Sequence, residues 1–495
     1  MRHLLALDLG TTTCRCLIFR EDGSVVSEAY RETRMIHEQA GWAESDPAEW
    51  WAHTRAVIRE ALAAGGVEPG SVAAIGLTGM MHAIVPVGAD GIPRARAMLW
   101  LDQRCQPQCT WLTREHEALL MEAHGTSRVT TTMSAPKLRW WVEHRPDVIE
   151  HTATFLLPKD VLRLHLTGVV ATDPSDASGT LLYSSPHAEW YWPLVEAVGL
   201  RREQFPPILS SEHVAGSVTR AAAAATGLQE GTPVVTGGSD VHCTLLGALH
   251  GVQDRATLYL GTAAWMITGP QDIRHKGQPS RFGSTATSGA ALRWCRDLFG
   301  PQSNGGSEGP SSYLRVAQLA SASPPGARGL LFLPHLMGER GMQADPLARG
   351  VLYGLTLAHQ QPDIYRAVLE GTAYQLRKIC EQIGLQNGAD VMMVGGGARG
   401  ELWPRVIADI TGHRILLPKV PEAAALGAAA LAQVGAGFVD HVAAAAVKMV
   451  HVRDVIEPDE QVADLYQRSY SAFCELEERV TPLYHRRGWP DAASG

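Results

Sequence analysis

The stretch LLALDLGTTTCRC at residues 4–16 places a carboxylate near the end of an apolar run with the composition of a buried strand. Asp8 lies within this run, and Gly10 and three threonines follow it. Burying a carboxylate costs free energy unless a cation or a hydrogen-bond donor pairs with it. The stretch therefore predicts a strand followed by a turn at which a cation or a phosphate group binds.

The same pattern returns about half a chain later. Residues 256–268 read ATLYLGTAAWMIT, which is an apolar strand, a Leu-Gly-Thr turn and a second apolar strand. Gly261 and Thr262 correspond to Gly10 and Thr11. We interpret this as an internal repeat, which predicts two related α/β lobes with equivalent tight turns.

Length and charge limit the class of protein. A chain of 495 residues suggests two or three domains. Its net charge of -8, without a long basic run, argues against nucleic acid or an anionic membrane as a partner. The N-terminal apolar run is too short for a signal peptide and we find no apolar segment of about 20 residues, so we expect a cytoplasmic protein. The eight cysteines lack zinc-site spacing and are expected to be free thiols.

Local signals predict several elements. The first 26 residues read as a three-stranded meander. A helix is expected after Asp46 as N-cap, with Pro47 at its first position, Glu49 completing a capping box, and a stop at residues 65–66. Apolar residues at helical spacing over 462–483 predict a terminal helix that packs as a structural closure.

Phosphate binding has to use the two Gly-Thr turns, because the chain lacks the GxxxxGK[ST] phosphate loop. Glycine opens the approach to the backbone N–H groups, and threonine hydroxyls add donors. Asp8 would then hold a magnesium ion, through water, beside the phosphates. The alternative is that Asp8 is a satisfied structural carboxylate and that the threonines only favour strands. The turn residues are Gly10, Thr11, Thr12, Gly261 and Thr262.

A glycine loop late in the chain offers a different nucleotide site. VMMVGGGARG contains GxGxxG at Gly395, Gly397 and Gly400, with Glu422 near the spacing of an acidic ribose partner. This is the dinucleotide fingerprint, and it raises the alternative of a nicotinamide-dependent dehydrogenase. That alternative leaves Asp8 and both Gly-Thr turns without a role. A glycine loop can also border the adenosine of ATP.

Polar residues after strands are the candidates for chemistry. Asp240 follows an apolar strand and a Gly-Gly turn, where it either takes a proton from an attacking hydroxyl or caps the next helix. Met81 and His82 follow the strand VAAIGLTG, where packing is the alternative to ligand binding. Trp100 and Asp102, in LWLDQR, line a polar pocket or form a surface pair with Arg104.

Taken together, these segments resemble the FGGY carbohydrate kinases, most closely the xylulokinase branch. The matches run in the family's order over residues 5 to about 435 and include ALDLGTTT, GLTGMMHA, LWLDQR, LLPKDVLRLHLTG, DPSDASGT, GGSD, LGT, FLPHLMGER and VGGGARGELWPRVIADITG. The resemblance implies a two-lobed, ribonuclease-H-like α/β fold of the sugar kinase, Hsp70 and actin superfamily with a central ligand cleft. We expect an N-terminal lobe over 1–245, an ATP-binding lobe over 246–440 and a helical closure over 441–495.

The implied activity is ATP-dependent phosphorylation of a sugar hydroxyl, most closely D-xylulose to D-xylulose 5-phosphate, with ATP and Mg²⁺ as cofactors. By resemblance, Asp240 is the general base and Asp8 organises magnesium and phosphate. The remaining roles also follow from the resemblance. Gly10, Thr11, Thr12, Gly261 and Thr262 cradle phosphate, Gly396, Gly397 and Ala398 border the adenosine, and Met81, His82, Trp100 and Asp102 contact the sugar with Asp240.

The sequence departs from the xylulokinase pattern at the sugar site. Val241 stands where these kinases carry asparagine, Met80 stands where they carry glutamine, and residues 341–343 replace polar residues. Losing a polar ligand changes which sugar fits, so another ketopentose, a sugar acid or a polyol is an alternative substrate. A non-catalytic sugar sensor on the same fold is a further alternative, although neither end carries a DNA-binding signal. The resemblance is compatible with a homodimer.

Overall fold

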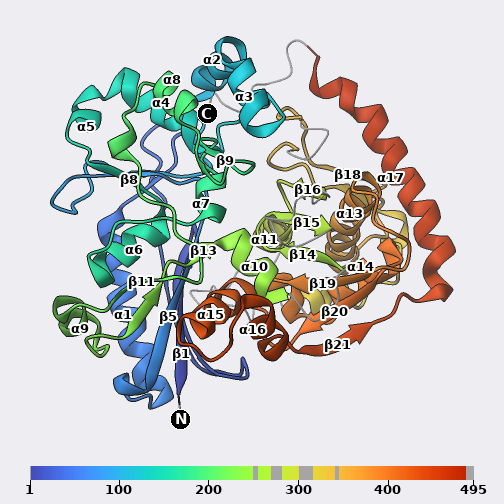
Figure 1. Ribbon diagram of the computed structural model, residues 1–495. Helices are drawn as coiled ribbons and strands as arrows, with labels where there is room; N and C mark the ends of the chain where they lie inside the picture. Colours follow the sequence, from blue (N-terminus) through green and yellow to red (C-terminus); the bar gives the residue numbers. More distant parts are fainter. Residues whose placement is uncertain (1, 249–254, 269–280, 300–315, 340–344, 487–495) are drawn as a thin grey trace. The chain divides into compact units, whose positions relative to one another are not determined.

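The structure is a computed structural model that describes residues 2–248, 255–268, 281–299, 316–339 and 345–486 (Figure 1). By their contacts, the residues group into two compact units. The first unit comprises Met1–Leu249 and Glu422–Val450, and the second comprises His250–Pro421 and His451–Gly495. The expected division placed residues 422–440 with the C-terminal half of the chain, whereas their contacts group them with the N-terminal half.

The first unit is built on a mixed sheet with the strand order β11-β12-β5-β1-β2-β3. Strands β1, β2 and β3 form the predicted antiparallel meander, β5 and β12 run parallel to β1, and β13 pairs with β5. The parallel strands end at one edge of the sheet, where the candidate residues follow them. The strands are β1 (His3–Leu9), β2 (Thr13–Arg20), β3 (Val25–Glu32), β5 (Val72–Gly79), β11 (Val214–Ser217), β12 (Pro233–Val235) and β13 (Gly238–Ser239).

The second unit repeats this topology in the order β16-β15-β14-β19-β20-β21. An antiparallel meander again leads into two parallel strands, and an antiparallel strand again closes the edge. The strand orders of the two sheets therefore confirm the predicted repeat. The strands are β14 (Ala256–Leu260), β15 (Ala264–Thr268), β16 (Arg281–Thr285), β19 (Asp390–Val394), β20 (Arg414–Pro418) and β21 (Val452–Ile456).

Helix α1 (Pro47–Gly65) begins and ends as predicted. The Asp46 side chain accepts a hydrogen bond from the Ala48 N–H, and Gly66 ends the helix in the left-handed conformation with φ 58°. The expected capping box is wrong, because a carboxylate oxygen of Glu49 accepts instead from the backbone N–H of Arg34 at 3.1 Å. The Glu49 carboxylate is thus bonded to a residue just after strand β3, whereas a capping box would have bonded it to the backbone N–H of Asp46.

Helix α15 (Ala423–Gly435) packs against β1, β5 and helix α10 (Asp240–Ala248) of the first unit. The helix backbones approach closely, since a Cβ atom on Gly247 would lie 1.9 Å from the Ala423 carbonyl oxygen and one on Gly427 would lie 1.9 Å from that of Cys243. Only glycine fits at such crossings. This contact ties a segment from late in the chain to the helix that begins with Asp240.

The other α-helices that the structure describes are divided between the two units. Those of the first unit are α2 (Gln106–Glu115), α3 (Glu117–His124), α4 (Ser134–His144), α5 (Pro146–Glu150), α6 (Pro158–Thr167), α7 (Pro174–Ser178), α8 (Trp192–Val198), α9 (Arg220–Thr226) and α16 (Val442–Met449). Those of the second unit are α11 (Gly289–Phe299), α13 (Gln361–Gln382), α14 (Leu402–Thr411) and α17 (Ala463–Tyr484). The part of the chain that the structure describes contains no helix long and apolar enough to cross a membrane.

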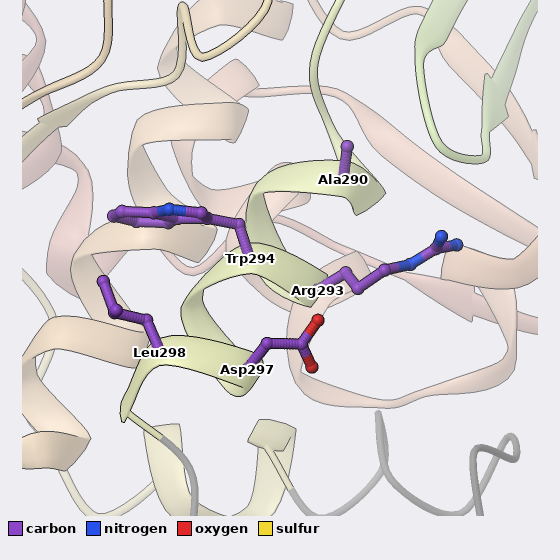
Figure 2. A pocket seen from close by; sticks show the side chains of 5 residues that line it. All are labelled: Ala290, Arg293, Trp294, Asp297 and Leu298. Atoms are coloured by element: carbon purple, nitrogen blue, oxygen red, sulfur yellow. The ribbon is translucent and has the colours of Figure 1, made fainter. Parts of the chain in front are cut away.

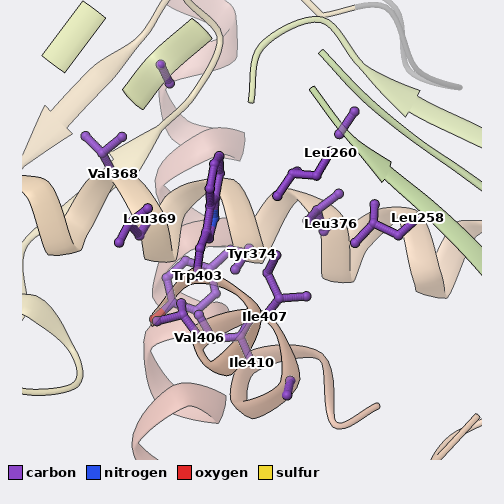
Figure 3. Packing of buried hydrophobic residues seen from close by; sticks show 14 of the residues in the cluster. Leu258, Leu260, Val368, Leu369, Tyr374, Leu376, Trp403, Val406, Ile407 and Ile410 are labelled. Atoms are coloured by element: carbon purple, nitrogen blue, oxygen red, sulfur yellow. The ribbon is translucent and has the colours of Figure 1, made fainter. Parts of the chain in front are cut away.

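The core of the second unit lies around helix α13. Leu258 and Leu260 of β14 meet Leu376 of α13 and Trp403 and Ile407 of α14 in one buried cluster (Figure 3). Helix α17 is the predicted terminal helix. It joins the same cluster through its buried aromatic residues, which are Tyr466, Tyr470 and Phe473.

Candidate active site

Strands β1, β5 and β13 bring two carboxylates to one edge of the first sheet. Strand β5 lies between the other two, and its Thr78 pairs with Asp8 of β1 on one side and with Gly238 of β13 on the other. Asp240 follows β13 directly. Because parallel strands share one carboxyl edge, Asp8 and Asp240 flank the end of β5.

Asp240 is the first residue of α10, and the preceding residue caps this helix. Ser239 Oγ accepts a hydrogen bond from the His242 N–H at 3.2 Å, so Ser239 takes the capping role that was the alternative for Asp240. Asp240 Oδ1 accepts from the Val241 N–H at 2.8 Å. Loss of hydration and the nearby charge of Asp8 raise the pKa of Asp240 to about 7. A half-buried carboxylate with this pKa can gain and lose a proton near neutral pH.

Asp8 is the second carboxylate of this edge. Burial raises the pKa of Asp8 to about 6, against the opposing charge of Arg15 on β2. Arg15 itself pairs with Glu28 at 3.0 Å and Glu422 at 3.4 Å. Among the residues that the structure describes, none donates a hydrogen bond to the Asp8 carboxylate. Two nearby carboxylates with raised pKa values form a donor set that fits a divalent cation.

The turn after β1 brings together residues predicted for two different ligands. The Gly10 N–H donates to the Thr13 carbonyl at 2.8 Å, which closes the turn. Thr12 at its tip is exposed and Thr11 is half-buried. The Trp100 indole N–H donates to Thr11 Oγ1 at 2.8 Å. Trp100, predicted to contact the sugar, therefore lies against the predicted phosphate turn.

Residues Met81 and His82 follow β5 at the same edge. Both are half-buried, whereas Met80 is 1% exposed and belongs to the core. His82 has a φ of 66° and its Nδ1 lies 2.7 Å from the Gly179 carbonyl oxygen. A carbonyl only accepts, so Nδ1 carries the proton, and burial lowers the pKa of His82 to about 4. The ring is therefore neutral and its Nε2 is an acceptor.

Asp102 lies in a different environment from the one expected for a sugar ligand. It is 0% exposed, and its carboxylate accepts from the Ala43 N–H at 2.8 Å and from the Arg104 guanidinium at 2.7 Å. Arg104 also lies 3.4 Å from the ring centre of Trp42. These contacts support a role in holding the loop that carries Trp100.

The second unit places its Gly-Thr turn at the equivalent edge of its own sheet. The backbone N–H groups of Ser288 and Gly289 donate to the carbonyls of Thr262 and Gly261 at 3.0 and 2.9 Å. These bonds hold the turn against the start of α11. Thr262 is exposed. The side chain of Thr262 and the backbone of the turn beside it are therefore accessible to a ligand.

The glycine loop lies beside this turn, because β19 pairs in parallel with β14. Gly395 adopts φ 89°, and residues 396–399 form a 3-10 turn before α14. A Cβ atom on Gly397 would lie 2.2 Å from Leu260 Cδ2, while one on Gly396 would meet nothing within 4 Å. Ala398 is 1% exposed. Of the predicted adenosine residues, Gly396 is therefore open, Gly397 is needed for close packing and Ala398 supports the loop from beneath.

Two hollows in the second unit were not anticipated. One, of about 450 Å³, lies on α11 and is lined by Ala290, Arg293, Trp294, Asp297 and Leu298 (Figure 2). The other, of about 360 Å³, contains His335 between Glu339 and Glu477. Neither is lined by a predicted site residue. Residues 341–343, where the sequence departs from the xylulokinase pattern, lie outside the described residues.

A buried ionic cluster beneath Asp240 was missed by the sequence reasoning. It joins Lys159 to Asp160, Asp173 and Asp176, all fully buried. The segments LLPKD and DPSDASGT supplied a signal, because buried-looking stretches with charges require partners.

Comparison with known proteins places this geometry in a family. The profile of the FGGY family of carbohydrate kinases matches residues 3–247 with its N-terminal domain and 272–436 with its C-terminal domain. Xylulose kinase of Bacillus subtilis (strain 168) is 30% identical to this chain, and the match covers 96% of each of the two chains. Autoinducer-2 kinase of Enterobacter sp. (strain 638) is 29% identical over 94% of this chain and 92% of that protein.

Solved structures agree. The crystal structure of xylulose kinase from Rhodospirillum rubrum matches with a TM-score of 0.81 and 29% identity, covering 98% of this chain and 100% of that one. The expected two-lobed α/β fold is thereby confirmed, and the dehydrogenase and sensor alternatives give way to a sugar-phosphorylating enzyme. The chain belongs to the FGGY family of carbohydrate kinases.

Proposed function

We propose that this kinase transfers the γ-phosphoryl group of ATP to D-xylulose and forms D-xylulose 5-phosphate. The relatives named xylulose kinase, which match nearly the whole chain, support this substrate. The observation that carries the catalytic proposal is the Asp240 carboxylate, whose pKa is about 7, beside Asp8 at the carboxyl edge of parallel strands. The cosubstrate of the family is ATP.

Asp240 is the general base in this proposal. As the sugar hydroxyl oxygen bonds to the γ-phosphorus, the bond from phosphorus to the β,γ-bridging oxygen breaks and ADP leaves. The hydroxyl proton passes to the Asp240 carboxylate. General-base catalysis is efficient when the pKa of the base lies near the working pH, which the raised pKa of Asp240 provides.

ATP binding draws on backbone groups in this proposal. The turns at Gly10–Thr12 and Gly261–Thr262 donate N–H and hydroxyl groups to phosphate, and the open face at Gly396 borders the adenosine. Asp8 would hold the magnesium ion. When bound, magnesium supplies positive charge that favours negative charge on phosphoryl oxygens. Fixed donors stabilise the loose transition state without reorganising.

The sugar contacts the residues around Asp240. The neutral ring of His82 accepts a hydrogen bond from a sugar hydroxyl through Nε2, and Met81 and Trp100 provide apolar surface. Asp102 acts through Arg104 on the loop that carries Trp100. These assignments keep the hydroxyl that reacts next to Asp240.

A second acceptor is favoured by one observation. Val241 is half-buried directly after Asp240 and offers no side-chain hydrogen bond where xylulokinases carry asparagine. A site that lacks this bond loses much of its discrimination for the matching hydroxyl. Another ketopentose, a sugar acid or a polyol is therefore the alternative acceptor.

A coupled ADP-release assay tests both levels of the proposal. Purified protein is given Mg-ATP with D-xylulose, D-ribulose, L-xylulose, L-ribulose, D-gluconate, glycerol, erythritol or xylitol. We expect the highest kcat/KM with D-xylulose. A higher value with another acceptor overturns the substrate and keeps the kinase, whereas absence of ADP release with every acceptor, while ATP still binds, overturns the catalytic roles.

A further inference from the structure

A buried ionic cluster lies beneath the strand that leads to Asp240. Lys159 Nζ lies 2.7 Å from Asp160 Oδ1, 3.0 Å from Asp173 Oδ1 and 3.0 Å from Asp176 Oδ2. Arg163 adds a second cation, 2.9 Å from Asp160. All five side chains are 0–1% exposed. A buried ion pair costs desolvation free energy that its own attraction barely offsets, so stability alone is a weak reason for it.

Asp173 connects this cluster to two serine hydroxyls. As the N-cap of α7, Asp173 accepts from the Ser175 N–H at 2.9 Å. The same carboxylate oxygen also accepts from Ser175 Oγ–H at 2.5 Å and from Ser211 Oγ–H at 2.9 Å. Because Asp173 cannot donate while ionised, the direction of both hydroxyl bonds is fixed.

Only the hydroxyl of Ser175 passes this constraint on, because Ser211 contacts the same segment through its backbone carbonyl, which accepts from the Gly237 N–H at 2.9 Å and is kept in an alanine variant. The Ser239 N–H donates to Ser175 Oγ at 2.9 Å. Ser239 pairs with Gly79 of β5 and caps α10 with its own hydroxyl, and Asp240 is the next residue. The Ser175 hydroxyl therefore accepts from the backbone before Asp240 and donates to Asp173, which Lys159 holds.

We propose that Lys159, Asp173 and Ser175 are positioning residues that fix the backbone at Ser239 and thereby aim the carboxylate of Asp240. The proposal rests on the proposed role of Asp240 as general base. Lys159 and Asp173 anchor the relay, and Ser175 is its last side chain. Misplacing a reacting group by about 1 Å costs roughly a hundredfold in rate, so a hydrogen bond to the adjacent backbone is enough to affect turnover.

The first test compares Ser175→Ala with Ser211→Ala. Each removes one hydroxyl from the same oxygen of Asp173, and the α7 cap survives in Ser175→Ala because it uses the backbone N–H. For Ser175→Ala we expect kcat to fall roughly ten- to a hundredfold, with the KM for ATP unchanged. A better hydrated Asp240 would also move the acid limb of kcat/KM to lower pH. Ser211→Ala should stay within about threefold of the wild type.

The second test reads the backbone without any turnover. Hydrogen exchange at the Ser239 amide should become faster in Ser175→Ala and stay slow in Ser211→Ala, because only Ser175 accepts from that N–H. Ser175→Thr, which restores a hydroxyl, should recover part of kcat. Ser175→Cys keeps the size with a weaker hydrogen bond and replaces Ser175→Ala if that variant does not fold.

The outcomes separate this inference from the proposed function. Equal kcat and equal Ser239 exchange in the two alanine variants, with an active wild type, overturn the positioning role. An inactive wild type, or an active Asp240→Asn variant, overturns the function instead. Faster exchange at Ser239 with unchanged kcat and pH profile shows a merely structural bond and also overturns the proposal.

Discussion

The two Gly-Thr turns share a backbone plan and differ in the residue pair placed beside it. In the first unit, Asp8 of β1 faces Arg15 of β2 across the antiparallel pair. At the corresponding position of the second unit, Tyr259 of β14 faces Trp265 of β15, with the rings stacked 5.4 Å apart. A charged pair in one sheet is thus an aromatic pair in the other.

The residues after the neighbouring parallel strand differ in the same sense. Strand β5 continues into Met81 and His82, whereas β19 continues into the glycine loop that starts at Gly395. The first edge presents ionisable side chains and the second presents backbone. One repeated scaffold therefore presents side chains suited to acid–base chemistry in one unit and backbone groups suited to hydrogen bonding in the other.

Substitution of Asp240, the proposed general base, should have the largest effect on this difference between the two units. We expect Asp240→Asn to lower kcat by about 10²- to 10⁴-fold, because the amide cannot take the hydroxyl proton, while ATP binding persists. Turnover and calorimetric ATP titration measure the two effects. In the wild type, kcat/KM should fall below about pH 7 as Asp240 gains its proton. Near-normal turnover in the variant contradicts the assignment.

The equivalent positions Asp8 and Tyr259 give a matched pair of variants. Asp8→Asn should lower kcat about tenfold or more and raise the magnesium concentration needed for half-maximal rate, since one carboxylate ligand is lost. It should also move the acid limb to lower pH, because the charge of Asp8 helps to raise the pKa of Asp240. Tyr259→Phe, the control, should change neither the magnesium requirement nor the acid limb. An equal effect of the two substitutions would show that the charge is not what distinguishes the turns.

The glycine loop allows a smaller test within the second unit. Gly397→Ala places a Cβ 2.2 Å from Leu260, so the loop has to shift and the KM for ATP should rise several-fold. Gly396→Ala meets nothing within 4 Å and serves as the control for stability. Thermal melting and ATP titration of both variants measure these effects. A larger loss of stability in Gly396→Ala would contradict the packing described here.

The smallest expected effect is on stability. The pKa of Asp240 is about 7 in the fold and about 3.9 in an unfolded chain, so the folded state binds more protons between these values. The contribution of Asp240 to the free energy of unfolding therefore falls as pH rises through that window. Above about pH 7 this destabilising effect no longer increases. Asp240→Asn should raise the melting temperature by a few degrees at pH 8 and by less near pH 4. A lower melting temperature at pH 8 would show that the carboxylate stabilises the fold.

Local patterns predicted the elements that carry the site. The apolar run around Asp8, the signals at Asp46 and Gly66 and the repeated Gly-Thr turn each depend on neighbours in sequence, and the structure contains all three. The capping box failed because the donor to Glu49 comes from Arg34, fifteen residues away. Periodicity carries no record of such partners.

The remaining features depend on distant contacts. Asp102 looked available for a ligand, but Ala43 and Arg104 engage its carboxylate. No sequence signal singled out Ser175, and only the fold brings its hydroxyl to Ser239, 64 residues later. Sequence reasoning can identify residue types suited to chemistry, whereas their supporting contacts need the tertiary structure.

The close crossing of α15 with α10 has a consequence for how the protein is made. Residues 422–450 complete the unit that starts at the N-terminus, so the ribosome has to synthesise the intervening sheet first. Until then, the nascent N-terminal unit exposes the apolar surface of β1, β5 and α10 that α15 later covers. Such exposed surface favours aggregation and chaperone binding. The helix that presents Asp240 acquires its final packing only after residues 422–450 have been synthesised.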